Sequence, residues 1–345
     1  MLVTDMRPIS MVEGEGFKAL IKTLHPGYVL PSRWVNCFNA CYVVFEICFE
    51  CKTADAWTSV ATKAYLGITC HYIGDNWEME SVCLTTLPLQ DRHTASNIAD
   101  WLEEVVAKYE IPVTRVAAIV HDNGANIVGA ARLLEEKHGW MSVRRTGHTL
   151  QLAVNTAIKA HQSTERALGA ARSLVEHFHK SELARTKLKA KQLQMNTPQK
   201  KLIQDVATRW NSTYYMVESL LQQRWPVTAT LLDSSITPKG KRYLDLKPDQ
   251  WSLLEELLKT LKRFEVATVF MSGQNYVTIS AVPTLARGLL KATQNASFES
   301  PPMKAFQATM TEQLKKRWDR ETSFTDTAPN AVIMSAALDP RFKKL

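Results

Sequence analysis

The hydrophobic pattern changes once along this chain of 345 residues, and the change limits the folds that the chain can adopt. Before about residue 147, short apolar runs rich in β-branched and aromatic residues alternate with amphipathic stretches. After that point the apolar residues recur mainly at helical spacing. We therefore expect a mixed α/β sheet with flanking helices, followed by a mostly helical region.

The first part of the chain predicts four strands and two helices behind a helical lead-in at residues 1–33. Gly74-Asp75-Asn76 favours a turn, so the second and third strands are expected to pair as a hairpin. An antiparallel meander that leads into a β-α-β unit indicates a mixed sheet. The expected strands are 43–51, 65–73, 77–89 and 116–120, and the expected helices are 94–109 and 125–137.

The second part predicts helices separated by prolines, which interrupt the helical pattern. The expected helices are 148–171, 174–193, 212–232, 250–271 and 282–293. The predicted domains are the lead-in at 1–33, an α/β core at 34–147, and a basic, mostly helical region at 148–345 that returns in part to the core.

Charge is divided as unevenly as hydropathy. Residues 1–140 contain 11 Lys and Arg against 17 Asp and Glu, whereas residues 141–345 contain 31 against 17. The net charge of +8 therefore originates in the helical part. A strongly basic region indicates a polyanion partner such as DNA, and a basic helical bundle without such a partner is the alternative.

The composition excludes several classes of protein. A hydrophobic fraction of 45% with 22% charged residues is ordinary for a globular chain and excludes a disordered or collagen-like one. No window has the roughly 18–20 consecutive apolar residues of a membrane span, so no membrane partner is expected, and the first residues do not resemble a signal peptide. Six cysteines in such a chain indicate reduced thiols inside the cell. The spacing of Cys37, Cys41, Cys48 and Cys51 is too short for a zinc finger, so we expect buried thiols and no zinc.

Two aspartates follow predicted strands. Asp55 comes after the first strand and Asp122 ends the fourth. Carboxylates at the ends of neighbouring strands can converge on divalent cations that activate water for phosphodiester cleavage. The alternative is that both are helix caps or turn formers, because aspartate is favoured at such positions.

A run of cations lies between residues 180 and 201, and Arg209 precedes Trp210 at a predicted helix start. Phosphate contact and a solvated helix are both consistent with the lysines. Arg209 and Trp210 suit a phosphate contact beside a stacked base, although an aromatic side chain at a helix start often packs in the core. The lysines assigned to DNA contact are Lys187, Lys189, Lys191, Lys200 and Lys201.

Five motifs, in order along the chain, resemble those of hAT-superfamily transposases. The resemblance is greatest to the domesticated members known as zinc finger BED domain-containing proteins. The motifs are TADAWTS at 53–59, HDNGAN at 121–126, GHTLQLAV at 147–154, DVATRWNSTY at 205–214 and SAALDPRFK at 335–343.

The resemblance implies an RNase H-like core that is interrupted or followed by an all-α insertion region. In active members three acids bind Mg²⁺ and cut DNA, and Asp55 and Asp122 match the first two. Trp57 and Trp210 match the aromatics that hold a flipped base, which needs a π-face to stack on. His148 matches the histidine of a Cys-x2-His motif in which Arg145 replaces the cysteine, and we expect it to be a structural residue.

Departures from the family pattern predict that the chain is not an enzyme. The third acid belongs to a C-terminal segment that we do not recognise in these 345 residues, and we expect no BED finger, since no Cys/His set of the right spacing is found in them. We therefore expect a nuclear protein that binds DNA without cleaving it, in transcriptional or chromatin-related regulation. No cofactor is expected to be required, and Mg²⁺ is expected at most at a vestigial site of Asp55 and Asp122. An Mg²⁺-dependent nuclease and a protein-interaction module are the alternatives, and oligomerisation is left open because the family's dimerisation region is missing.

Overall fold

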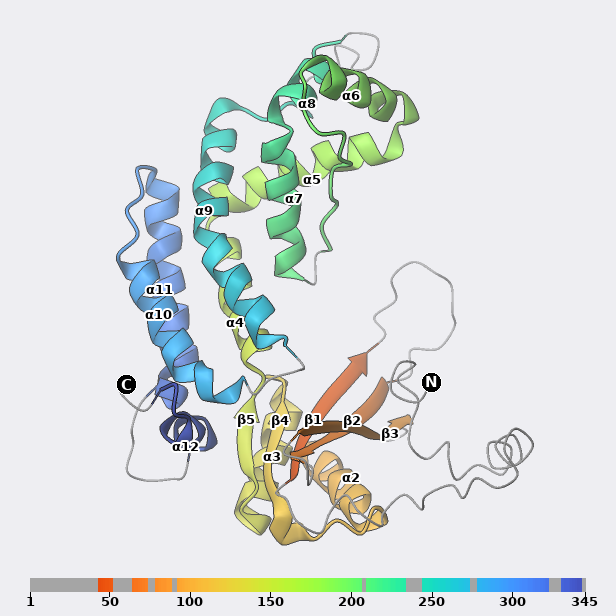
Figure 1. Cartoon of the computed structure of the whole chain (residues 1–345), viewed down its shortest axis with the longest axis vertical. Helices are drawn as coiled ribbons and strands as arrows, with labels where there is room; N and C mark the ends of the chain where they lie inside the picture. The colour runs from red at the N-terminus through yellow and green to blue at the C-terminus, as the bar shows by residue number, and fades with distance from the viewer. Residues whose placement is uncertain are drawn as a thin grey trace, which may run out of the picture. The chain divides into compact units, whose positions relative to one another are not determined.

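The computed structural model describes most of the chain (Figure 1). The predicted lead-in at 1–33, Cys37 and Cys41, and the candidate residues Asp55 and Trp57 lie outside the described residues. The described ranges are 43–51, 64–73, 78–88, 92–206, 209–233, 244–273, 278–322 and 330–342.

Two compact units make up the chain. The first contains the described residues up to His148 and the short range 330–335. The second contains Thr149–Gly273, the described part of 278–325, and residues 336–342. Each unit has a hydrophobic core made only of its own residues.

A five-stranded mixed sheet forms the first unit, with the order β3-β2-β1-β4-β5. The first three strands are antiparallel neighbours, which confirms the predicted hairpin, and β4 and β5 continue the sheet in parallel from β1. The expected mixed α/β sheet is therefore confirmed. The strands are β1 Val43–Cys51, β2 Ala64–Ile73, β3 Met79–Pro88, β4 Val116–His121 and β5 Met141–Arg144.

The last strand, β5, is absent from the sequence prediction. Its four residues, Met-Ser-Val-Arg, are too few and too polar to produce a strand pattern. It forms because it extends β4, with Val120 opposite Val143.

Two helices, α2 Ala95–Lys108 and α3 Ala125–His138, pack on each other and on the sheet. The Thr94 side chain caps α2 by accepting a hydrogen bond from the Asn97 amide at 3.2 Å. Along β2 every second side chain is buried, as expected for a strand with one face in the core. Residues from both helices and three strands form this core, including Leu66, Ile68, Ile98, Leu102, Ile119, Ile127 and Leu134.

The second unit is helical, as predicted, but three of the predicted helices are each divided in two. The predicted helix at 174–193 is divided at Ser181, whose side chain accepts a hydrogen bond from the Ala184 amide at 3.2 Å and so caps the second half. The predicted helix at 212–232 ends at Gln222, because Pro226 has no amide hydrogen and its ring would clash with the carbonyl of that residue. The predicted helix at 148–171 is interrupted near His161. The resulting helices are α4 Thr146–Lys159, α5 Gln162–Lys180, α6 Glu182–Gln194, α7 Trp210–Gln222 and α8 Arg224–Leu231.

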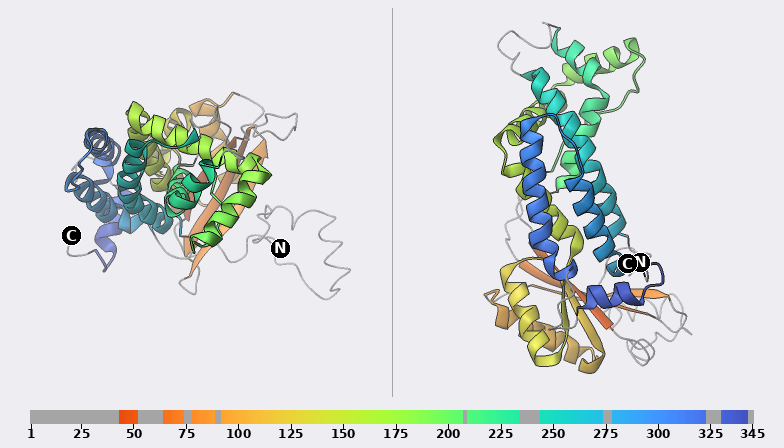
Figure 2. Two further views of the ribbon diagram at one scale, coloured as in Figure 1. Left: turned by 90° about the horizontal axis from the view of Figure 1, so that it is seen from above. Right: turned by 90° about the vertical axis from the view of Figure 1, so that its left-hand side faces the viewer.

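The remaining helices are α9 Pro248–Met271, α10 Val282–Gln294, α11 Pro301–Thr322 and α12 Ala331–Leu338. The first two agree with the predictions at 250–271 and 282–293, whereas α11 and α12 were not predicted. Figures 1 and 2 show α10 and α11 side by side. Among the helices that the structure describes, none is sufficiently long and apolar to cross a membrane.

Candidate nucleic-acid interface

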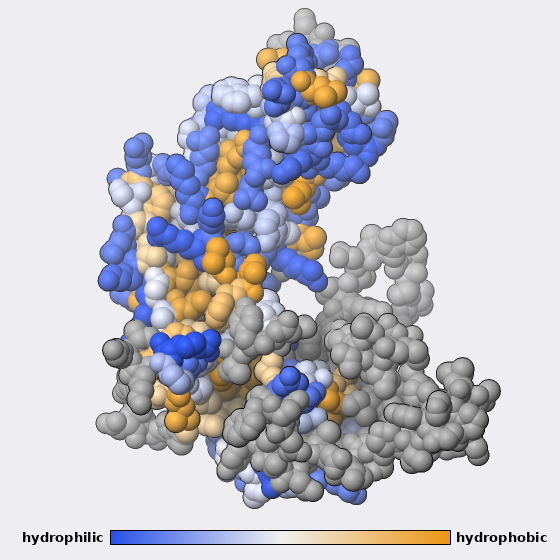
Figure 3. Space-filling view, in the orientation of Figure 1, coloured by the Kyte–Doolittle hydropathy of each residue, from blue (hydrophilic) through white to orange (hydrophobic). Residues whose placement is uncertain are grey.

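The extended segment 197–206, here called the strap, follows α6 and leads back to α7. Side chains of the neighbouring helices hold its backbone. Gln192 Nε2 donates to the Lys200 carbonyl at 2.9 Å, and His179 Nε2 donates to the Leu202 carbonyl at 2.8 Å. The strap is thus a fixed part of the surface, and hydrophilic atoms dominate the face over α5 and α6 in Figure 3.

Asp205 holds the end of the strap. Its side chain is only 3% exposed, and its Oδ2 accepts hydrogen bonds from Arg172 Nε at 2.6 Å and from Thr213 Oγ1 at 3.1 Å. These contacts connect the strap to α5 and α7. The sequence places Asp205 in a family motif but gives it no role. Arg172 lies 33 residues earlier on α5, and Thr213 lies on α7, so local spacing reveals neither contact.

The predicted DNA-contacting lysines lie on α6 and the strap. Lys187, Lys189, Lys200 and Lys201 are exposed, and Lys191 is half-buried. Lys187 Nζ lies 4.0 Å from Asp233 Oδ2, and Lys191 donates to Gln194 at 3.1 Å. Among the described residues, Lys189, Lys200 and Lys201 have no ion-pair partner.

Arg209 and Trp210 differ in their accessibility. Arg209 is exposed and is the N-cap residue of α7, whereas Trp210 is 2% exposed and belongs to the core of the helical unit. Trp210, Thr213, Tyr214 and Val217 recur at helical spacing on the buried face of α7. The Trp210 ring therefore offers no open face to a base in this structure, although the family motif implied that it would hold a flipped base. It packs in the core instead, which was the alternative interpretation of an aromatic residue at a helix start.

Two tyrosines of the same motif bind carboxylates. Tyr214 donates to Glu218 at 3.0 Å, and Tyr215 donates to Glu265 at 2.5 Å. Burial, together with the bond to Glu218, raises the pKa of Tyr214 to about 12. The hydrogen bond to Glu265 is the main reason that the pKa of Tyr215 is also raised to about 12. Both phenols are therefore neutral donors at physiological pH.

In the sheet unit, Asp122 lies between β4 and α3 and is half-buried. Its Oδ1 accepts a hydrogen bond from the Gly124 amide at 2.8 Å, so the carboxylate shapes the turn into α3. A side chain at Gly124 would place its Cβ 3.0 Å from that same oxygen. The contact agrees with the turn-former interpretation. Within the described ranges no three His, Cys, Asp or Glu residues are placed to hold a metal ion.

His121, which sequence reasoning left without a role, positions the backbone beside Asp122. Its fully buried ring contacts the Asp122 carbonyl through Nδ1 at 2.6 Å and the Ser142 hydroxyl through Nε2 at 2.9 Å. Because a carbonyl only accepts, Nδ1 carries a proton and donates it to the Asp122 carbonyl. His121 thus connects β4 to β5. His148, in the first turn of α4, is half-buried.

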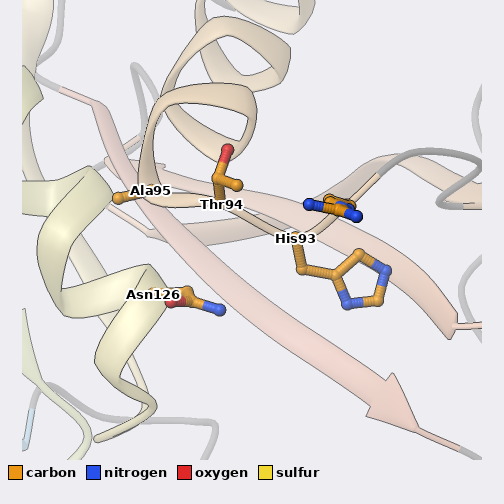
Figure 4. A pocket seen from close by; sticks show the side chains of 5 residues that line it. His93, Thr94, Ala95 and Asn126 are labelled. Carbon is orange, nitrogen blue, oxygen red and sulfur yellow. The ribbon is translucent and has the colours of Figure 1, made fainter.

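A surface pocket of about 450 Å³ lies where α2 and α3 begin (Figure 4). His93 and Asn126 point into the same space from opposite sides. Gly129, one turn after Asn126, faces Ala95 so closely that an added Cβ would lie 2.8 Å from the Ala95 Cβ. The pocket is lined by Arg92, His93, Thr94, Ala95 and Asn126.

Comparison with protein families identifies both units. The family model described as "ZBED1 RNase-like domain" matches residues 53–147, and the one described as "ZBED1 RNase-like helical domain" matches residues 143–260. The chain belongs to the hAT-derived, zinc finger BED domain-like family. The RNase-like match contains Asp122, and the helical match contains the strap, Asp205 and Trp210.

Curated relatives of this hAT-derived chain come from animals, plants and fungi. Human zinc finger BED domain-containing protein 4 is 28% identical over 99% of this chain and 30% of its own length. The Zea mays protein named "Putative AC transposase" is 24% identical over 98% of this chain and 43% of its own length. The Talaromyces stipitatus protein named "Putative transcriptional regulator tpeD" is 24% identical over 66% of this chain. The chain spans less than half the length of the curated relatives that it matches.

Proposed function

We propose that this hAT-derived chain binds DNA through α6 and the strap, without cleaving it, and acts in the nucleus in the regulation of transcription. The observation that carries the proposal is the strap, whose backbone is fixed by Gln192, His179 and Asp205 while Lys200 and Lys201 project from it. A fixed backbone with exposed cations lowers the entropy that is lost when phosphates bind.

Local electrostatics support the proposal. Between Lys180 and Arg209 the sequence has eight Lys and Arg but only two acids, Glu182 and Asp205. Glu182 pairs with Arg185, and Asp205 is buried against Arg172. Both acids are thus occupied by other arginines, which leaves the lysines of the strap to attract phosphates. The names of the relatives, which include a transposase and a transcriptional regulator, agree with a partner of this kind.

Duplex binding measured over a range of salt concentrations tests the proposal. We expect log K to fall linearly with log salt, because bound phosphates release counterions, with a slope that decreases by about 0.9 for each contact removed. Removing exposed cations from the interface, by the combined change Lys189→Gln, Lys200→Gln, Lys201→Gln and Arg209→Gln, should weaken binding and flatten the slope.

The matched control removes the same charge from other helices of the same unit. Lys259 and Lys262 on α9 and Lys304 and Lys315 on α11 are all exposed, and changing these four to Gln should leave the slope nearly unchanged. Equal losses of DNA affinity in the two quadruple variants would show that binding depends on the net charge of the chain and not on the strap. A wild-type chain that binds neither duplex nor single-stranded DNA at low salt would refute the proposal and favour a protein-interaction module.

Cleavage is tested on the same DNA with Mg²⁺ added. Asp122 is the described residue that matches a catalytic acid, so nuclease activity would have to depend on it. We expect intact DNA from the wild-type chain. Mg²⁺-dependent nicking that disappears in Asp122→Asn would show instead that the chain is an active nuclease.

A further inference from the structure

Trp225, the second residue of α8, is 68% exposed. A tryptophan with so much of its ring in water loses the free energy that burial would provide, and the sequence pattern assigns it no role. Figure 3 shows that hydrophilic residues cover much of the surface over α6 and α8. Such an aromatic residue on a basic surface suggests a ligand with an apolar, planar group.

The Trp225 ring is near the Arg224 guanidinium, which also lies near the buried ring of Trp251. The Arg224 guanidinium lies 5.0 Å from the centroid of the Trp225 ring and 5.1 Å from the centroid of the Trp251 ring. Arg224 Nη1 also donates to Glu255 at 2.8 Å. Trp251 is 3% exposed and belongs to the core of the helical unit. The guanidinium therefore lies close to both a buried and an exposed indole and is held by Glu255, so that Trp225 has an ordered neighbour before any ligand binds.

The proposed DNA-binding helix packs against the helix that carries this aromatic residue. α6 packs against α8, and the Gln192 side chain near the end of α6 donates to Gln223, the N-cap of α8. Lys191 and Trp225 therefore lie at the same end of the helix pair. At the other end, Lys187 lies 4.0 Å from Asp233. Cations that contact phosphates next to an open aromatic face are the combination found in single-strand binding surfaces.

We propose that Trp225 stacks on an unpaired base of single-stranded DNA whose phosphates contact the lysines of α6. The inference rests on the proposed DNA binding and makes it more specific, because a paired base in a duplex does not expose its face. The chain should then prefer a single strand, or a duplex with unpaired bases, over a fully paired duplex. Little preference among bases is expected, since every base has a π-face.

The test compares binding of an oligo(dT) strand and of a paired duplex by the full chain and three variants. Trp225→Ala should weaken oligo(dT) binding by about 5- to 100-fold, the range typical of one stacked base. Duplex affinity should remain within about twofold, since the lysines are unchanged. Trp225→Phe should retain much of the oligo(dT) affinity, whereas Trp225→Leu, which is apolar but has no π-face, should lose as much as Trp225→Ala.

Leu232 supplies the control. It is the C-cap residue of α8, seven residues after Trp225, and is 74% exposed. Leu232→Ala should leave oligo(dT) binding unchanged. If Trp225→Leu binds as well as Trp225→Phe, or if Leu232→Ala weakens binding equally, the contact is a general apolar one without base stacking, and the inference is wrong. Salt-dependent DNA binding that no Trp225 variant alters would also overturn it, while leaving the proposed function intact. A wild-type chain that binds neither oligo(dT) nor the duplex would refute both the base stacking by Trp225 and the proposed DNA binding.

Discussion

At the scale of single residues, Asp205 contributes most to the shape of the candidate interface. Its carboxylate is buried, and one oxygen accepts hydrogen bonds from both Arg172 and Thr213. A buried carboxylate that loses its charged partner is costly, because water cannot replace the lost contact. The position of Lys200 and Lys201 therefore depends on a residue that does not itself face the solvent.

Asp205→Asn should lower the free energy of unfolding by about 2 kcal/mol, because a charged hydrogen bond becomes a neutral one in a buried site. Urea unfolding followed by circular dichroism measures this change. Glu176→Gln is the matched control, since Glu176 and its partner Lys180 on α5 are both more than half exposed. It should change stability by less than about 0.5 kcal/mol. Equal losses in the two variants would contradict the structural role of Asp205.

The two tyrosines that bind glutamates predict a loss of stability at alkaline pH. Their pKa values rise from 10.0 to about 12 in the folded chain, so an unfolded chain ionises first. The stability contribution is therefore complete below pH 10 and is lost progressively up to about pH 12. Urea midpoints measured across this interval should fall less steeply in Tyr214→Phe/Tyr215→Phe than in the wild type. Parallel curves would argue against the raised pKa values.

At the scale of elements, the close approach of α2 and α3 depends on one glycine. Gly129 leaves no room for a side chain, because an added Cβ would lie 2.8 Å from the Ala95 Cβ at the start of α2. In contrast, Gly169 in the interior of α5 has nothing within 4 Å of an added Cβ. The same substitution should thus have opposite effects at these two positions.

Gly129→Ala should destabilise the chain by about 1–3 kcal/mol, since the two helices must separate to relieve the contact. Gly169→Ala should stabilise it by up to about 1 kcal/mol, because alanine favours the helix and meets no obstacle. Thermal or urea unfolding provides both values. Two changes of the same sign would show that the packing of α2 on α3 tolerates a larger separation than the structure indicates.

At the scale of the whole molecule, each of the two units has its own hydrophobic core. Leu134 belongs to the core of the sheet unit and Leu220 to that of the helical unit, and both are fully buried. Truncating either one should destabilise its own unit by about 2–5 kcal/mol, the range for leucine cavities. Contacts within one core cannot by themselves stabilise the other.

Hydrogen exchange should show which of the two units each substitution destabilises. Leu134→Ala is expected to increase amide exchange in α2, α3 and β4, and Leu220→Ala in α5, α7 and α9. Each variant serves as the control for the other, because the residue type and the burial are the same. If either variant increases exchange equally in both units, the chain unfolds as a single cooperative body.

The sequence by itself determined the features that depend on local pattern. Short apolar runs rich in β-branched and aromatic residues predicted β1 to β4, a turn signal predicted the hairpin, and helical periodicity predicted most helices. Five motifs led to the family that the comparisons then showed. The exposed positions of Lys200 and Arg209 could also be expected, since charged side chains are rarely buried without a partner.

Only the tertiary structure decided the features that depend on distant neighbours. β5 exists because β4 offers it a hydrogen-bonding edge, Trp210 is buried because it begins the inner face of α7, and Asp205 acquires its role from Arg172 on α5. Trp225 became a candidate only when the structure showed it exposed beside a guanidinium that also lies near the buried Trp251. Local spacing records which side chains share a face of one element, but the environment of that face is set by residues that the chain brings together from elsewhere.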